Sequence, residues 1–460
     1  METDRRWLER ATVHTPVACG LVAAGLAFLG PSTVLTLAVL VPLGVALVRR
    51  PQRGLLLLAA LVPFDGLLLL LDPVPPLVAG WKEGLVLITL AATFVAPAGA
   101  RAPRGRPLPA WWPAVAALLS VSLASGVVVG GLQAAWGLKI AFFFLLVALA
   151  AWRCPPDARE RDRLVTILLV TGVVTAVYGI VQQAMGHDAL HHLGYQYNTA
   201  IRFTGGFVRS FSTFDNPFGF GYFLMLVLLI VVPHALSEPR RLRSRVVLCC
   251  LPVLALGLAA SFVRGAWIGL AVGLAYLAWS RFRALALGIP VVAVVLVLLP
   301  GAVTSAAFAG SSGVDRVNTW HANLSEIASH PVGVGVGSSN AAAEKVLGAE
   351  REDEVFHPDN EYYRALYELG VIGLWLVVLV LAATFGATRK ASTRLEPDGS
   401  LFALATSATI LAAAASGFVT TYFDTFPNDM YFWLLVGSVA ALDAGRRRGP
   451  VDTAAVHSAG

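Results

Sequence analysis

Long apolar runs, separated by short polar connections, dominate the pattern of residues along the chain. The runs have the length that a helix needs to cross a bilayer, and their apolar residues surround the helix instead of marking one face, as in segments 132–152 and 164–184. A soluble core would show an apolar stripe or a strict alternation. The pattern therefore predicts an all-α polytopic membrane protein.

We expect about 14 transmembrane helices (about 12–14, since the two shortest runs need not cross fully). The first run is interpreted as a retained helix and not as a signal peptide, because no small-residue cleavage site separates it from the second. The predicted spans are 17–30, 32–48, 54–71, 81–95, 110–129, 132–152, 164–184, 217–232, 246–262, 266–280, 284–299, 366–383, 401–419 and 430–444.

Lysine and arginine residues gather in every second connection between these spans. Short cytoplasmic loops hold the excess of such residues in membrane proteins. Both termini are therefore expected in the cytoplasm, and the number of spans is expected to be even. The clusters are Arg5, Arg6 and Arg10, followed by those in 49–53, 101–106, 153–163, 240–245, 281–283, 389–394 and 446–448.

Two of the remaining connections, 185–216 and 301–363, are long enough to carry chemistry. The second is a large extracytoplasmic loop between the eleventh and twelfth helices, and it is too long to be a simple link. We therefore divide the chain into N-terminal transmembrane helices at 1–184 and a second membrane domain at 185–460 that includes both loops. Function is expected in these loops.

Composition agrees with a membrane environment. Of the 460 residues, 57% are hydrophobic and 13% are charged, whereas about a quarter of a soluble domain is charged. The net charge of +6 does not indicate nucleic acid, because most arginines flank apolar runs. Membrane lipids are expected as partners, and nucleic acid is not.

Five arginines contradict the positive-inside pattern, because they are predicted on the outer side: Arg202, Arg209, Arg264, Arg316 and Arg364. The planar guanidinium suits phosphate through two parallel hydrogen bonds, so several of them at an outer surface indicate a pyrophosphate-bearing lipid. The alternative is that each pairs with a carboxylate or extends to lipid head groups. For Arg202 and Arg364 we favour this alternative, and we expect substitution of Arg202 to be mild.

The second loop holds an amphipathic segment and a glycine-rich segment. Residues 315–327 predict a short helix on the membrane surface, anchored by Trp320. The glycines of HPVGVGVGSS, which starts at His330, lack the Lys-Ser/Thr of a nucleotide-binding loop. A tight turn is favoured there over a backbone-amide cradle for an anion.

No metal ion or other cofactor is expected. The chain has no Asp-x-Asp motif, which disfavours a metal-dependent transferase, and His187, His191 and His192 lack a convincing further ligand for zinc. Four charged residues in or at the ends of spans are expected to form structural ion pairs rather than a proton relay: Asp65, Lys82, Glu83 and Lys139.

Four sequence blocks, in this order, resemble the O-antigen ligase and Wzy-type O-antigen polymerase superfamily over roughly the second half of the chain. Three residues depart from the family pattern: Ser212 stands for Gly, Phe218 for Asn and Val263 for Ser. The blocks are RSFSTFDNPFGFGYF from Arg209, VRGAW from Val263, a stretch from Arg316 and Trp320 through Pro331, Gly333 and Gly335 to Gly337, and HPDNEYYRALYELGVIGL from His357.

The resemblance implies a metal-independent, inverting glycosyltransferase embedded in the bacterial cytoplasmic (inner) membrane, which acts in polysaccharide biosynthesis of the cell envelope. Its donor would be an undecaprenyl-pyrophosphate-linked glycan, and its acceptor a hydroxyl of a glycan or lipid. By the same resemblance, Arg209, Arg264 and Arg316 would bind the donor pyrophosphate. Six further residues would support the motifs: Asn216, Trp267, Trp320, Asn360, Gly370 and Gly373.

The catalytic base has two candidates. Counting back from Gly370 and Gly373 puts Asp359 at the position of the family's histidine, and His357 stands two residues earlier. In one interpretation Asp359 caps the following helix and His357 is the base, because an imidazole suits proton transfer around neutrality. In the other, Asp359 accepts the proton or orients the acceptor, and His357 supports it.

Two further alternatives stay open from the sequence. A ligase and a polymerase use the same donor and differ only in the acceptor. A transporter or flippase of lipid-linked or anionic substrates would also need many spans and buried cations. It predicts internal repeats, helices broken at matching positions and charges near mid-membrane, whereas the sequence offers large outer loops.

Overall fold

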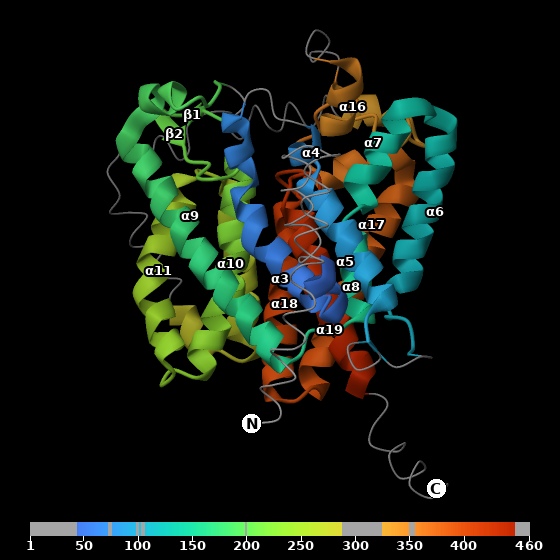
Figure 1. The fold of residues 1–460 in the computed structure, drawn as a ribbon. Helices are drawn as coiled ribbons and strands as arrows, with labels where there is room; N and C mark the ends of the chain where they lie inside the picture. Colours follow the sequence, from blue (N-terminus) through green and yellow to red (C-terminus); the bar gives the residue numbers. More distant parts are fainter. Residues whose placement is uncertain are drawn as a thin grey trace, which may run out of the picture.

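The computed structural model of the protein describes residues 44–71, 76–97, 101–102, 106–197, 200–287, 324–348 and 355–446. In these ranges the protein consists of helices and one two-stranded hairpin (Figure 1). The elements are α3 (Gln52–Leu61), the 3-10 helix η1 (Val62–Leu70), α4 (Pro76–Ala79), α5 (Trp81–Val95), α6 (Trp112–Val129), α7 (Gly131–Phe142), α8 (Leu145–Arg153), α9 (Ala158–His192), β1 (Arg202–Thr204), β2 (Phe207–Arg209), α10 (Pro217–Ser237), α11 (Leu242–Ala260), α12 (Arg264–Ser280), the 3-10 helix η3 (Arg283–Leu287), α16 (Asn340–Leu347), α17 (Glu361–Arg394), α18 (Pro397–Ser416) and α19 (Asn428–Arg446).

Seven helices of the described ranges are long and apolar enough to cross a membrane, or eight if α7 and α8, bent by 44° at their junction, form one span. This confirms a multi-pass, all-α membrane protein. The predicted span at 17–30, and most of those at 32–48 and 284–299, lie outside the described residues. The total of about 14 and the placement of the second long loop therefore stay predictions.

Helix α9 shows how polar residues extend an apolar run. Its amino end carries a capping box, in which the Asp157 carboxylate accepts from Glu160 N–H at 2.8 Å and the Glu160 carboxylate accepts from Asp157 N–H at 2.9 Å. Both bonds satisfy backbone donors that a helix start leaves unpaired. Near its other end, Gly186 adopts φ 73° and breaks the helix.

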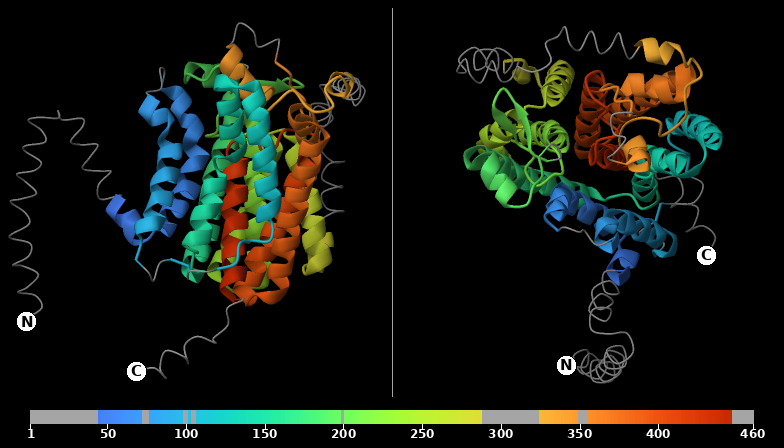
Figure 2. Two further views of the ribbon diagram at one scale, coloured as in Figure 1. Left: turned by 90° about the vertical axis from the view of Figure 1, so that its right-hand side faces the viewer. Right: turned by 90° about the horizontal axis from the view of Figure 1, so that it is seen from above.

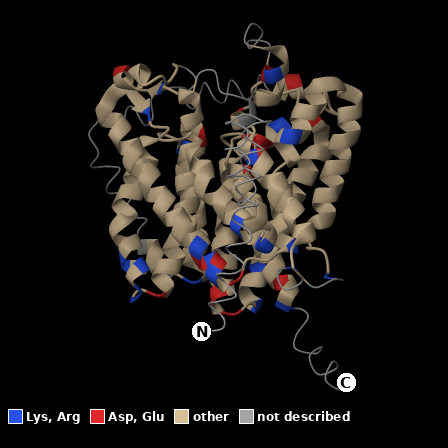
Figure 3. Cartoon of the chain, in the orientation of Figure 1, with Lys and Arg blue, Asp and Glu red and all other residues tan. Residues whose placement is uncertain are grey.

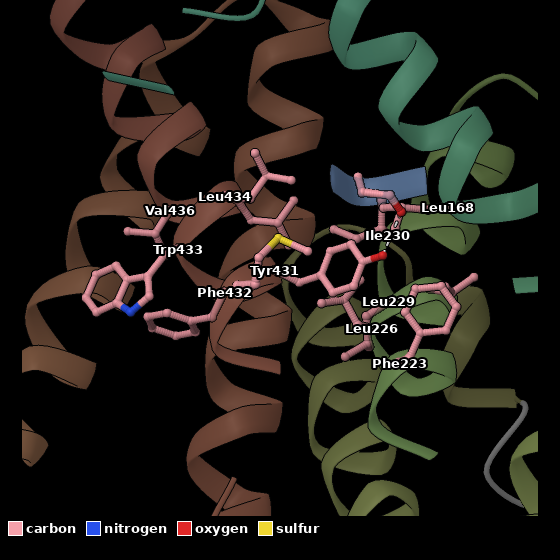
Figure 4. Close-up of a cluster of buried hydrophobic side chains, with 14 of the residues drawn as sticks. Leu168, Phe223, Leu226, Leu229, Ile230, Tyr431, Phe432, Trp433, Leu434 and Val436 are labelled. Carbon is pink, nitrogen blue, oxygen red and sulfur yellow. Dashed lines mark hydrogen bonds between the residues drawn. The ribbon is translucent and has the colours of Figure 1, made fainter. Parts of the chain in front are cut away.

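One hydrophobic core joins helices from both halves of the chain. Helix α18 packs against α10, α12, α17 and α19, and α19 also packs against α8 (Figure 2). Around Tyr431 of α19, Leu168 of α9 and Phe223 of α10 come together, and the Tyr431 hydroxyl donates to the Ala59 carbonyl at 2.7 Å (Figure 4). The predicted regions 1–184 and 185–460 thus contribute to the same core.

The basic connections gather at one end of the bundle (Figure 3). Two grooves share Arg161 at this end, and a third groove there holds Lys390 and Arg394. Of the predicted clusters, the two grooves with Arg161 include Arg49, Arg50, Arg101, Arg106, Arg241, Arg243 and Arg281. The prediction that these clusters share one side is confirmed for the described residues, and the orientation of that side in the cell stays a prediction.

Candidate functional site

The first motif block begins in the β1–β2 hairpin, at the end of the bundle opposite the one where the basic connections gather (Figures 1 and 3). The guanidinium carbon of Arg209 lies 4.7 Å from the centre of the Phe218 ring. Ser210 N–H donates to the Ala260 carbonyl at the end of α11 at 2.9 Å. This bond joins the segment of Arg209 to the turn that precedes Arg264.

The residues after Arg209 are held by α9. The Gln182 side-chain oxygen accepts from Ser212 N–H at 2.7 Å, and the Ser212 hydroxyl donates to the Thr175 carbonyl at 2.6 Å. Ser212 has φ 55°, a left-handed conformation in which glycine is most at ease. The family's Gly at this position is thereby explained, and the hydroxyl bond helps to hold a serine there.

Asn216 caps α10, because its side-chain oxygen accepts from Phe218 N–H and Gly219 N–H, both at 3.0 Å. Its amide group donates to the Asp215 carboxylate at 2.9 Å. Burial raises the pKa of Asp215 to about 6, although Lys82 opposes this shift. Sequence reasoning missed Asp215, an acidic residue inside a motif block that could have drawn attention.

The predicted structural ion pairs are present, one between η1 and α5 and the other between α5 and α7. Lys82 pairs with Asp65 at 2.5 Å, and the Asp65 carboxylate also accepts from the Trp81 indole N–H at 2.7 Å. Lys139 pairs with Glu83 at 2.6 Å. Both pairs consist of one cation and one carboxylate, as expected for charges that are partly removed from water.

The second block places Arg264 at the first position of α12. The Ser416 hydroxyl donates to the carbonyl of the next residue, Gly265, at 3.0 Å. A Cβ at Gly265 would lie 2.2 Å from the Tyr222 hydroxyl oxygen, so only glycine fits this approach. Trp267 donates its indole N–H to the Leu258 carbonyl at 3.2 Å and thus links α12 to the end of α11.

The fourth block corrects one prediction. Asn360, and not Asp359, caps α17: its side-chain oxygen accepts from Tyr362 N–H at 2.9 Å and from Tyr363 N–H at 3.1 Å. Asp359 is exposed and has φ 45°, so it forms the bend before the cap. The cap prediction for Asp359 is wrong by one residue, because asparagine can supply the same acceptor oxygen.

His357 lies on the surface next to α16. Its imidazole is 42% exposed, and Nε2 is 3.8 Å from Oε1 of Glu344, whose side chain is 43% exposed. A histidine in this position can exchange protons with water and with a substrate hydroxyl, as a general base requires.

The glycine-rich segment packs as a turn, as favoured from the sequence. Val334 N–H and Gly335 N–H donate to the carbonyls of Tyr367 and Glu368, at 2.9 and 2.8 Å, so these amides are used within the fold. Gly370 breaks α17 with φ 65°, and its Cβ position is 2.6 Å from the Pro331 carbonyl oxygen. At Gly373 a Cβ would meet the Leu369 Cβ at 2.1 Å. The Gly-x-x-Gly pair therefore permits the broken helix.

Arg364 pairs with carboxylates, as favoured from the sequence. Its guanidinium lies 2.5 Å from Glu361 and 3.8 Å from Glu368. Asp424 also faces Arg364, and burial raises its pKa although Arg364 lowers it. The sequence analysis did not single out Asp424, although an acidic residue in an apolar stretch near a span indicates a structural or functional role.

The turn at 416–424 connects two of the motif blocks. It bonds to Gly265, next to Arg264, through Ser416, and to Asn360, whose amide donates to the Phe418 carbonyl at 3.0 Å. The first block is joined to the segment before Arg264 through the Ala260 carbonyl. Two predicted site residues, Arg316 and Trp320, lie outside the described residues.

Comparison with known proteins gives a family match over a range that includes the second, third and fourth blocks. Residues 248–378 match the family model described as O-Antigen ligase, a range that includes Arg264, His357 and Gly373. The chain is also similar to a protein named O-antigen polymerase from Salmonella muenchen, with 23% identity over 319 residues that cover 64% of this chain and 77% of the relative. With the long apolar helices, these matches show a multi-pass membrane protein that is similar to the O-antigen ligase and polymerase family, whose activity is of the glycosyltransferase type.

Proposed function

We propose that the protein transfers a glycan from undecaprenyl pyrophosphate to a hydroxyl of a glycan or lipid acceptor on the extracytoplasmic face of the membrane. The observation that carries the proposal is the bond from Ser210 N–H to the Ala260 carbonyl, which joins the segments of Arg209 and Arg264. Both segments lie at the end of the bundle opposite the basic grooves (Figures 1 and 3). Under this proposal the two guanidiniums, with Arg316, bind the donor pyrophosphate.

The reaction is a single displacement. The acceptor oxygen attacks the anomeric carbon on the face opposite the pyrophosphate, and the bond from that carbon to the phosphate oxygen breaks. Undecaprenyl pyrophosphate departs with the electron pair, so the configuration inverts. The guanidiniums stabilise the growing negative charge, in place of a metal ion. The hydroxyl proton passes to a base, for which His357 and Asp359 are the candidates.

Transfer can be measured with the purified full chain in lipid nanodiscs. The substrates are lipid-linked glycans extracted from the organism that makes the protein. The readout is release of undecaprenyl pyrophosphate together with a longer or newly linked glycan. Arg209→Ala and Arg264→Ala should each reduce the rate about 10- to 100-fold or more, because each removes charge-assisted hydrogen bonds worth about 1.5–3 kcal/mol. Arg→Lys should rescue only in part, since lysine lacks the planar fork.

Arg241→Ala is the matched control, because Arg241 is exposed at the basic end and pairs with Glu238. Its rate should equal that of the wild type. A normal rate for Arg264→Ala in a well-expressed protein would exclude the proposed role. A deletion strain separates the two acceptors: loss of long chains from an acceptor indicates a ligase, and accumulation of single repeat units on lipid indicates a polymerase.

A further inference from the structure

The β1–β2 hairpin pairs Arg202 directly with Arg209. Side chains paired in this way start about 4.5–5.5 Å apart on one face of an antiparallel ladder. Like charges in this arrangement repel each other and destabilise the strand pair. An anion that both guanidiniums contact would replace this repulsion with attraction.

Phe218, in the first turn of α10, lies under both guanidiniums. The guanidinium carbon of Arg209 is 4.7 Å and that of Arg202 is 5.8 Å from the ring centre. Both distances are within the range of about 6 Å for a cation–π contact. Such a contact orients the guanidinium through its flat face, whereas phosphate is bound by the N–H groups at its edge.

The start of α10 adds a favourable field. This 21-residue helix begins at Pro217, directly after its cap Asn216. The amino end of a helix carries a partial positive charge that stabilises nearby anions. The two arginines and the helix end are therefore positive groups around one aromatic ring.

We propose that Arg202, Arg209 and Phe218 form a two-guanidinium clamp for the phosphate groups of the lipid-linked donor. The clamp rests on the function proposed above, and it replaces the expectation that substitution of Arg202 is mild. Arg202 contacts the pyrophosphate directly. Phe218, which stands where the family has asparagine, is a positioning residue that acts through the two guanidiniums.

Binding of undecaprenyl pyrophosphate to the full chain tests the clamp without knowledge of the sugar. The protein is placed in phosphatidylcholine nanodiscs, and bound lipid is measured by native mass spectrometry across a concentration series. Arg202→Ala should weaken binding about tenfold, and Arg202→Lys should weaken it less. Arg241→Ala should bind within twofold of wild type. In the transfer assay, Arg202→Ala should raise the KM for the donor more than it lowers kcat.

Phe218 is tested by shape. Phe218→Leu should weaken binding severalfold, whereas Phe218→Trp, which keeps a cation–π surface, should bind like the wild type. Combined with Arg202→Ala, Phe218→Leu should add less than its separate effect, because the two residues act as a unit. Full additivity, or equal losses for Leu and Trp, would overturn the positioning role.

Three results would overturn the clamp. One is that Arg202→Ala binds the lipid within twofold of the wild type while Arg209→Ala and Arg264→Ala bind it more weakly. This result would leave the proposed function intact. Another is equal displacement of the pyrophosphate lipid by phosphatidylglycerol, which would make the hairpin a general head-group anchor. Normal transfer by all three alanine variants would reject the proposed function as well. Alanine at position 202 could disturb the hairpin itself. Arg202→Gln therefore serves as a second variant that removes the charge but keeps a long side chain, and its thermal unfolding midpoint shows whether the fold is intact.

Discussion

A histidine and an aspartate two positions apart compete for the role of the base. His357 is 42% exposed, and Glu344 is 3.8 Å away, which is an electrostatic contact but too long for a hydrogen bond. Asp359 has φ 45° and does not cap α17. Asparagine and aspartate are the residues other than glycine that tolerate this conformation best. Asp359→Asn therefore changes the charge while it preserves the bend.

We predict that His357→Ala is nearly inactive and that Asp359→Asn keeps measurable activity. Loss of a general base costs roughly 10²- to 10⁴-fold in rate, whereas the asparagine retains the backbone geometry before the Asn360 cap. The rates of transfer are compared at equal expression. The opposite pattern would assign the base to Asp359, in the register of the family's histidine. If both variants are fully active, this loop does not supply the base.

The contact between the glycine-rich segment and the break in α17 leaves no room for side chains. A Cβ at Gly333 would lie 2.6 Å from the Glu368 carbonyl oxygen, and a Cβ at Gly370 would lie 2.6 Å from the Pro331 carbonyl oxygen. Both glycines also have positive φ, at 89° and 65°. Because the clashing atoms are backbone, neither side can move alone.

We predict that Gly333→Ala and Gly370→Ala each lower the thermal unfolding midpoint in detergent and reduce transfer. The left-handed conformation costs alanine about 1–2 kcal/mol, and overpacking adds about 1–3 kcal/mol. Gly386→Ala is the control in the same helix, because its Cβ meets nothing within 4 Å. That variant should be as stable as the wild type or slightly more stable, since alanine favours a helix. An unchanged midpoint for Gly370→Ala would contradict this account of the break.

The sequence predicts the elements better than their ends and their partners. The run 81–95 coincides with α5, since its apolar pattern ends with the helix. Helix α9 begins at Ala158, before the predicted 164, because the capping box of Asp157 lies among polar residues that hydropathy does not count. The pairing of Arg202 with Arg209 could not be predicted, because three-residue strands are too short to show an alternating pattern. The approach of Asp424 to Arg364 could not be predicted either, because a contact between residues far apart in the sequence leaves no local sequence pattern.

At the scale of the whole molecule, charge divides the bundle into two ends. Basic connections from six parts of the chain line the grooves at one end, where Arg161 contributes to two of them. The hairpin, α16 and the start of α17 lie at the other end (Figure 1). Because the excess of arginine and lysine marks the cytoplasmic side of membrane proteins, the motif blocks would face outward, where a lipid-linked glycan is exposed after its translocation.

This orientation gives the last prediction, which fusion reporters can test. Fluorescent protein fused after Arg245, Arg283 or Arg394 should report the cytoplasm, since each position follows a basic cluster. Alkaline phosphatase inserted within 185–216 or 338–351 should be active, because it folds only outside. Each site should be tested with both reporters, so that a poorly expressed fusion is not mistaken for a location. Cytoplasmic placement of 338–351 would put His357 on the wrong side of the membrane for the donor and would refute the proposed reaction.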